Sequence, residues 1–108
     1  MELVTIRVKS YKDIPNNYTG IVEYANGSRY WLLNGEFHRT DGPAVELFNG
    51  TKHWYLNGEF HRTDGPAIEY ANGTKFWYVN GEYYTKEEHF QYVAKHYPES
   101  IRKLIWNL

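Results

Sequence analysis

Cysteine is absent from the 108 residues of this chain. Its absence excludes disulfide bonds, catalysis by a thiolate and zinc sites with cysteine ligands, so packing must stabilise the fold. Long apolar runs are also missing, and none approaches the length of a membrane span. The first residues hold no basic segment followed by an apolar block, as a secretion signal would. We therefore expect a cytoplasmic protein that does not bind a membrane.

Charge of one sign is not concentrated in any segment, and the formal net charge is −1. Nucleic acid is therefore an unlikely partner, because binding a phosphate backbone calls for a basic stripe. Most glycines follow Asn or Asp singly and form no phosphate-binding loop. No Ser, Thr or Lys is placed as an activated nucleophile. These absences predict a protein that is not an enzyme and needs no cofactor.

Aromatic residues, by contrast, are abundant: the chain has 11 Tyr, 5 Phe and 4 Trp. Such side chains suit β-strands, where a large ring packs across the pleat. One eleven-residue string, Asn-Gly-Glu-Phe-His-Arg-Thr-Asp-Gly-Pro-Ala, occurs twice without a change, at 34–44 and at 57–67. Two identical copies 23 residues apart predict a chain built from repeats.

The internal alignment predicts a single domain over residues 1–108. Residues 1–23 form a degenerate N-terminal repeat, 24–84 the β-hairpin repeats and 85–108 a C-terminal helical cap. Thr85 and Glu88 have the spacing of a capping box at a helix start. Pro98 separates two amphipathic segments. We expect these helices to cover the open end of the sheet or to reach a second subunit.

Asn-Gly pairs flanked by β-formers are the strongest short-range signal for hairpins, because both residues tolerate the positive φ of a type I′ turn. We expect three hairpins, at 20–33, 44–56 and 67–79, each closed by a two-residue loop. The fold class is then mainly β, a single-layer antiparallel meander of hairpin units of about 23 residues, capped by two short C-terminal α-helices.

Two-residue loops would also determine which residues lie on each face of the sheet. The expected core face pairs Val22 with Trp31, Val45 with Trp54 and Ile68 with Trp77, next to Leu33, Leu56 and Val79. The expected outer face holds Tyr30, Leu32, His53, Tyr55, Phe76 and Tyr78. Glu46 would pair with His53 on this outer face, where the carboxylate would favour the protonated imidazole.

The doubled string holds the residues most suggestive of chemistry: His38, Arg39 and Asp41, repeated as His61, Arg62 and Asp64. Like residues at equivalent positions form a ladder, whereas a catalytic site needs different groups that converge on one point. Asp before Gly-Pro can hold a tight turn, and Arg can brace its carboxylate. We interpret these residues as structural. His38, His53 and His61 have no recognised metal-ligand spacing, so we expect no metal.

The order Trp, Asn-Gly, His, a Gly-containing turn and a further Asn-Gly resembles the membrane occupation and recognition nexus (MORN) repeat. It looks closer still to a variant, Trp-x-x-Asn-Gly-x-x-His-Arg-x-Asp-Gly-Pro-Ala, of small bacterial and bacteriophage proteins. The similarity covers residues 24–83. It is carried by Trp31, Asn34, Gly35, His38, Gly42, Asn49 and Gly50, and by Trp54, Asn57, Gly58, His61, Gly65, Asn72 and Gly73.

This chain departs from the usual MORN repeat, because its spacing from Trp to His to Gly is longer by one or two residues. Arg39 and Arg62 also stand where that repeat has glycine. The resemblance implies stacked β-hairpins that form a non-catalytic scaffold. In the wider family such scaffolds bind partners and sometimes lipids.

Two functions remain open. In the first, the outer face and Trp106 bind another protein, since rigid aromatics are common binding anchors; Trp106 could instead pack against the sheet edge. By the resemblance, such a protein could be a phage-encoded inhibitor of a host defence or host enzyme, acting in the host cytoplasm. In the second, the same aromatics with Arg29, Lys52 and Lys75 bind and sequester a nucleotide or other small ligand.

Overall fold

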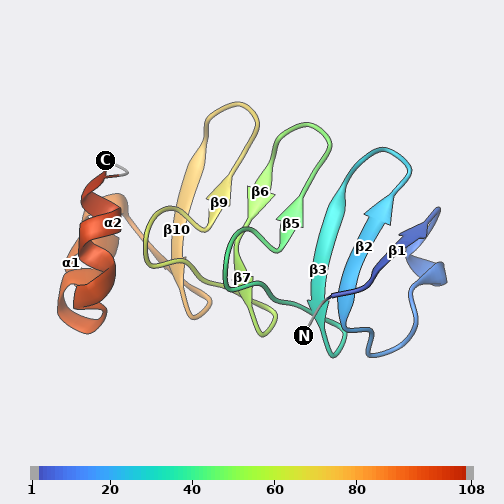
Figure 1. Cartoon of the computed structure of the whole chain (residues 1–108). Helices are drawn as coiled ribbons and strands as arrows, with labels where there is room; N and C mark the ends of the chain where they lie inside the picture. Colours follow the sequence, from blue (N-terminus) through green and yellow to red (C-terminus); the bar gives the residue numbers. More distant parts are fainter. Residues whose placement is uncertain (1–2, 107–108) are drawn as a thin grey trace.

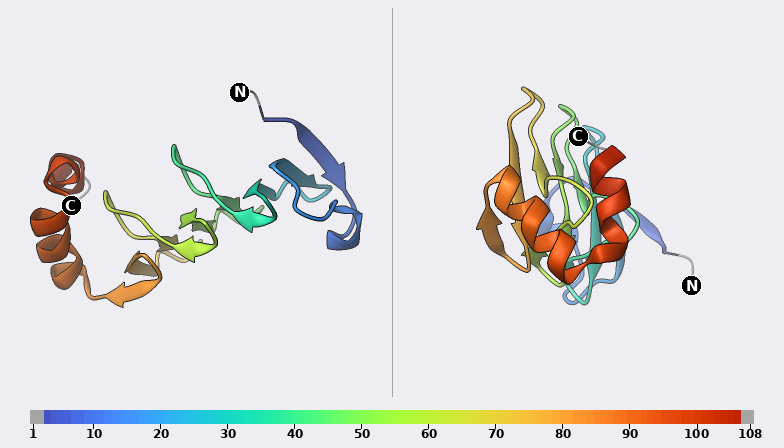
Figure 2. Two further views of the ribbon diagram at one scale, coloured as in Figure 1. Left: turned by 90° about the horizontal axis from the view of Figure 1, so that it is seen from below. Right: turned by 90° about the vertical axis from the view of Figure 1, so that its left-hand side faces the viewer.

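The computed structural model describes residues 3–106, with the side chain of Trp106 outside the description. The chain is mainly β and ends in two short helices, as predicted. Figure 1 shows the strands side by side, with both helices at the C-terminal end of the row. Figure 2 shows that the strands form one curved layer and that the helices rise from its concave side. None of the helices within residues 3–106 is long and apolar enough to span a membrane.

The strands are short, and most of them lie in the aromatic segments of the sequence. They are β1 (Thr5–Val8), β2 (Gly20–Tyr24), β3 (Arg29–Leu33), β4 (Glu36–Phe37), β5 (Val45–Glu46), β6 (Lys52–His53), β7 (Tyr55–Leu56), β8 (Glu59–Phe60), β9 (Ile68–Glu69), β10 (Lys75–Val79) and β11 (Glu82–Tyr84). The helices are α1 (Lys86–His96) and α2 (Ile101–Trp106), with the 3-10 turns η1 (Tyr11–Asp13) and η2 (Pro98–Ser100).

The main sheet has the strand order β1-β2-β3-β5-β6-β9-β10-β11, with β4 attached to β3. A separate two-stranded sheet joins β7 to β8. All these pairs are antiparallel except β1 and β2, which are parallel. The expectation of a purely antiparallel meander is therefore wrong at the N-terminal edge. Residues 9–19 are long enough to carry the chain back to the starting end of β1, as a parallel pair requires.

The predicted two-residue loops of the three hairpins are wrong, because each loop holds three residues. In the first, Tyr24 N donates to Ser28 O at 2.9 Å, so residues 25–27 form the loop. Only Gly27 has a positive φ, +94°. Asn26 Oδ1 accepts from Ser28 N at 2.8 Å and holds the turn. The loops at 48–50 and 71–73 have the same bonds, which is the arrangement of a three-residue loop with a glycine bulge.

This extra loop residue shifts the pairing by one. Val22 faces Tyr30, Val45 faces His53 and Ile68 faces Phe76. The predicted pairs with Trp31, Trp54 and Trp77 are wrong, and so is the Glu46–His53 pair, because Glu46 faces Lys52. Neighbouring residues on a strand point to opposite faces, so a slip of one residue exchanges the faces. Val22, Val45 and Ile68 thus share a face with the predicted outer aromatics, and the tryptophans lie on the other.

The face that carries these aromatics is partly covered by rings from the short strands that follow each hairpin. Successive rings lie with centroids 4.4–5.7 Å apart in the order Tyr24, Tyr30, Phe37, Tyr55, Phe60, Tyr78, Tyr83. We call these seven residues the aromatic row. Beside its N-terminal end, Val8, Val22 and Leu32 form a buried cluster. Much of the apolar packing therefore lies on the face that we expected to be the outer one.

On the tryptophan face, alternating charges cross seven strands of the main sheet. Cross-strand neighbours place them in the order Arg7, Glu23, Arg29, Glu46, Lys52, Glu69, Lys75. Glu23 accepts from Arg7 at 3.2 Å and from Arg29 at 3.0 Å, and the hydrogen bond from Arg7 is the main cause that lowers the pKa of its carboxyl. Opposite charges directly across a ladder favour this register over its neighbours.

The predicted capping box at the start of α1 is confirmed. Thr85 Oγ1 accepts from Glu88 N at 3.1 Å, and Glu88 Oε1 accepts from Thr85 N at 2.9 Å. Helix α1 contacts β10 and β11, and its N-cap residue Thr85 stands where the two earlier units have Arg39 and Arg62. The helices therefore take the place of a third crossing between hairpins.

Candidate functional site

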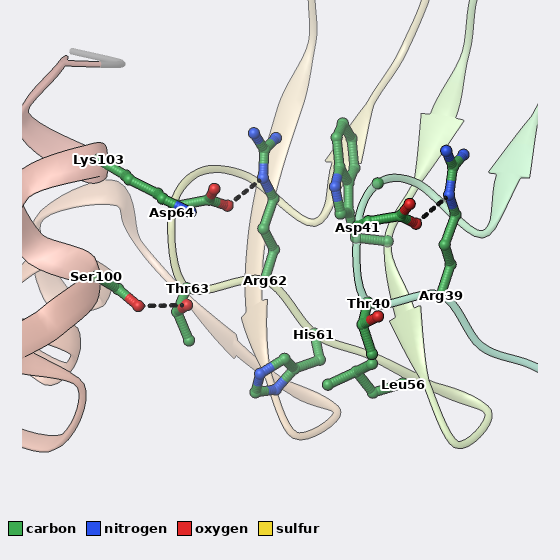
Figure 3. A pocket seen from close by; sticks show the side chains of 12 residues that line it. Arg39, Thr40, Asp41, Leu56, His61, Arg62, Thr63, Asp64, Ser100 and Lys103 are labelled. Atoms are coloured by element: carbon green, nitrogen blue, oxygen red, sulfur yellow. Dashed lines mark hydrogen bonds and ion pairs between the residues drawn. The ribbon is translucent and has the colours of Figure 1, made fainter.

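A groove of about 510 Å³ lies on the tryptophan face, between the two copies of the doubled string (Figure 3). Residues 39–42 line one side and 61–64 the other. Trp54 and Leu56 lie between them, and Ser100 and Lys103 border the groove from the C-terminal helices. We call this hollow the groove, and residues 39–43 and 62–66 the first and second crossings. The string that we interpreted as structural thus supplies both of its walls.

Each arginine of the string is held in place by several partners. Arg39 Nε donates to Asp41 Oδ1 at 2.8 Å, and Arg39 Nη1 donates to Pro43 O at 3.1 Å. Its Cζ lies 3.9 Å from the centroid of the Trp31 ring. The hydrogen bond from Arg39 is the main cause that lowers the pKa of the Asp41 carboxyl. The expected Arg–Asp contact is thus present, and the guanidinium braces the crossing.

The second copy repeats this arrangement. Arg62 Nε donates to Asp64 Oδ1 at 2.8 Å, and its Cζ lies 3.9 Å from the Trp54 ring. Arg62 Nη1 also donates to Glu69 Oε2 at 2.8 Å, where the first copy has a longer Arg39–Glu46 ion pair of 3.6 Å. With these contacts, neither guanidinium is presented to the groove as an open fork for a phosphate.

The histidines of the string fasten neighbouring hairpins. His38 Nδ1 accepts from Asn57 N at 3.0 Å, and His61 Nδ1 accepts from Asn80 N at 3.0 Å. Burial is the main cause that lowers the pKa of His61. Within residues 3–106 there is no group of three or more His, Cys, Asp or Glu that could hold a metal ion. Nδ1 of each histidine thus serves as a hydrogen-bond acceptor that joins one unit to the next.

The structure collects the predicted partner-binding residues on one face but covers much of them. Tyr30, His53, Tyr55, Phe76 and Tyr78 are half-buried among the rings of that face, and Leu32 is only 8% exposed. We expected an outer face that is open to a partner, but Phe37, Phe60 and Tyr83 fold onto it. The side chain of Trp106 lies outside the described residues.

The cations expected to join these aromatics in a nucleotide site lie elsewhere. Arg29 precedes Tyr30, Lys52 precedes His53 and Lys75 precedes Phe76. Because adjacent strand residues point to opposite faces, the three cations lie on the tryptophan face. The structure therefore separates the two halves of that predicted site.

Residues that the sequence did not single out connect the helices to the second crossing. His89 is fully buried, and its Nε2 donates to Arg62 O at 2.8 Å. Thr63 Oγ1 and Ser100 Oγ lie 2.9 Å apart. Burial is the main cause that lowers the pKa of His89. Thr63 could have been noticed in the sequence, because it belongs to the string that occurs twice. No local pattern indicates His89, because its hydrogen-bond partner is 27 residues away.

The two crossings have the same internal bonds but differ in exposure. The Asp41 side chain is 81% exposed, whereas that of Asp64 is 36% exposed. Thr40 is exposed and Thr63 is half-buried. The helices contact the second crossing and leave the first crossing open to solvent.

No protein-family model, no curated protein and no solved structure matches this chain.

Proposed function

We propose that this chain is a non-catalytic, MORN-like repeat scaffold that binds another protein in the groove. The repeat interpretation is supported by contacts that recur 23 residues apart. Ser28 Oγ accepts from Phe48 N as Thr51 Oγ1 accepts from Ala71 N. The carbonyl of Phe37 accepts from Gly58 N as that of Phe60 accepts from Gly81 N. Each unit is thus fastened to the next in the same way, which is how stacked repeats gain stability.

The observation that carries the binding proposal is the composition of the groove. It combines an apolar floor, Trp54 and Leu56, with a rim of accessible polar groups that includes Thr40, Asp41 and Lys103. Apolar centres with polar rims are typical of protein interfaces. The Arg and His side chains that could serve catalysis are occupied in bracing the crossings and joining the units. The groove therefore offers shape and surface chemistry rather than reactive groups.

The resemblance to the repeat variant of small bacterial and bacteriophage proteins supports a narrower form of this proposal. The partner would be a host defence protein or host enzyme that the chain inhibits in the host cytoplasm. A rigid scaffold suits such a role, because a surface already ordered before binding loses little entropy in the complex.

A second candidate is a small ligand such as a nucleotide. The groove of about 510 Å³ lies within the usual size range of small-molecule sites. A thermal-shift screen with a nucleotide panel tests this candidate. A concentration-dependent stabilisation would support it, whereas no shift above noise would remove it.

Site-specific photo-crosslinking in cells of the native host tests protein binding. A benzoyl-phenylalanine at position 41, on the groove rim, should give a discrete higher-mass adduct. The same group at Tyr11 is the matched control, because that side chain is 72% exposed and does not line the groove. The binding proposal fails if position 41 gives no adduct, or only adducts that position 11 gives equally.

A further inference from the structure

The main sheet has an uncovered edge at its N-terminal end. β1 is the first strand in the sheet order, and β2 is its only strand partner within residues 3–106. Figure 1 shows β1 at the end of the row opposite the helices. At the other end of the sheet, α1 contacts the last strand, β11. An uncovered edge strand is a template for strand addition, so β1 is where another chain can extend the sheet.

The backbone of β1 uses alternate residues on its two sides. Val4 O accepts from Ile21 N at 2.9 Å. The parallel register sets Thr5 opposite Ile21, with Arg7 two residues further along. In a parallel pair, the residue that follows a bonded carbonyl turns its own N–H and C=O to the other side of the strand. Thr5 and Arg7 therefore direct these groups outward, and among the described residues nothing is hydrogen-bonded to them.

The charges of the tryptophan face indicate which side chain is missing at this edge. Strands with a cation alternate across the sheet with strands in which a glutamate follows an apolar residue, namely Val22-Glu23, Val45-Glu46 and Ile68-Glu69. The cations of β3 and β6 have a glutamate strand on both sides. Arg7 of β1 has a glutamate only on its inner side, and its side chain is 82% exposed. A carboxylate on the outer side would continue the alternation.

The opposite face of β1 is apolar. Val8 belongs to the buried cluster described above, and Ile6 packs against that cluster and is half-buried. Val4, which directly precedes β1, is 66% exposed. Because neighbouring strand residues point to opposite faces, an added strand places apolar side chains beside Ile6 when its carboxylate lies beside Arg7.

We propose that β1 pairs antiparallel with an extended segment of another protein, in which apolar residues alternate with polar ones that include a carboxylate. The carboxylate lies opposite Arg7, as Glu46 lies opposite Arg29. Antiparallel pairing is the more stable arrangement per residue. A second copy of β1, Thr-Ile-Arg-Val, offers no carboxylate. β1 does not line the groove, so this inference goes beyond the proposed function and does not depend on it.

The probe is the capped peptide Thr-Val-Thr-Val-Glu-Val-Thr, titrated into the ¹⁵N-labelled full-length chain and followed by NMR. We expect shifts and slower hydrogen exchange at the Thr5 and Arg7 amides, because both N–H groups become hydrogen-bonded. A matched peptide with Lys in place of Glu should bind about fivefold more weakly. In the variant Arg7→Glu this preference should reverse, and Arg29 still pairs with Glu23 there.

Backbone methylation separates strand pairing from attraction between charges alone. A methyl group on the glutamate nitrogen, which faces β1 in this antiparallel pair, should abolish binding. On the nitrogen of the following valine, which faces away, it should not. The proposal is overturned if Thr5 and Arg7 do not shift, if the two methylated peptides bind alike, or if Arg7→Glu keeps the preference for the glutamate peptide. Shifts of these amides with protein concentration alone would also overturn it, since β1 would then pair with itself.

Discussion

His38 Nδ1 accepts a hydrogen bond from the backbone N of Asn57 at 3.0 Å, across the junction between two hairpins. His61 and Asn80 form the same bond at the next junction. The side chain that looked most suited to catalysis thus satisfies a backbone amide of the following unit.

Replacement of His38 by alanine should therefore lower the stability of the fold. The amide of Asn57 loses its acceptor, and we expect a cost of about 1–2 kcal/mol in the free energy of unfolding. His61→Ala should behave similarly, and urea titration measures both. His96→Ala is the control, since that side chain is exposed at the end of α1. Equal midpoints for His38→Ala and His96→Ala would contradict this role.

Replacement of His53 by phenylalanine should raise the stability of the fold. Its ring lies 5.6 Å from Phe60, and its buried Nε2 has no hydrogen-bond partner within the described residues. The corresponding positions in the other hairpins are Tyr30 and Phe76. We expect His53→Phe to raise stability by about 1 kcal/mol, because it removes an unpaired polar atom and keeps a ring. His53→Ala should lower stability; a Phe variant no more stable than wild type would refute the argument.

Stability should fall on mild acidification. Burial lowers the pKa of His53, His61 and His89 below the ordinary value of 6.5. Well above pH 6.5 these rings are neutral in both the folded and the unfolded chain, so they have no effect on stability there. Below it the unfolded chain takes up protons that the folded chain excludes, so the free energy of unfolding decreases as pH falls.

Urea titrations at pH 7.5 and pH 5.5 measure this effect. The combined variant His53→Phe/His89→Gln should show a smaller decrease, and glutamine at 89 keeps a donor for the Arg62 carbonyl. Glu23 and Asp41 have lowered pKa values and lose their contribution only as pH falls below their ordinary values of 4.5 and 3.8. An unchanged pH dependence in the double variant would assign the loss to other groups.

Glycine is needed at position 65 because the Arg62 guanidinium occupies the space of a side chain there. A Cβ there would lie 2.7 Å from Arg62 Cζ, and the residue has no positive φ. Gly65→Ala should push the guanidinium off Trp54 and cost about 1–2 kcal/mol. In an Arg62→Met background the same change should be nearly neutral. A double-mutant cycle by urea unfolding tests this coupling, and additive effects would show that the glycine acts without Arg62.

Local patterns in the sequence were sufficient to determine much of the fold. β-rich composition, three hairpins and the Thr85–Glu88 capping box are set by neighbouring residues, and the structure contains all of them. The Arg39–Asp41 contact is also local, since the two residues are two positions apart. These features depend on turn chemistry and side-chain reach within a few residues, so no long-range information is needed.

Which face is buried, and where the groove lies, was decided only in the tertiary structure. Asn26-Gly27 and Asn34-Gly35 are the same dipeptide, but only the second pair has positive φ at both residues. Asn26 turns its side chain to Ser28 N, whereas Asn34 N donates to Thr19 Oγ1 of a neighbouring segment.

The turn at Asn34-Gly35 is therefore accompanied by a hydrogen bond to a residue 15 positions away. The turn at Asn26-Gly27 is held by a side chain only two positions from its partner. The loop length sets the register, and the register assigns every strand residue to a face. For the same reason the sequence could not show that α1 would cover one copy of the string and leave its identical twin open. Identical residues have identical local structure, but their exposure depends on what the rest of the chain places beside them.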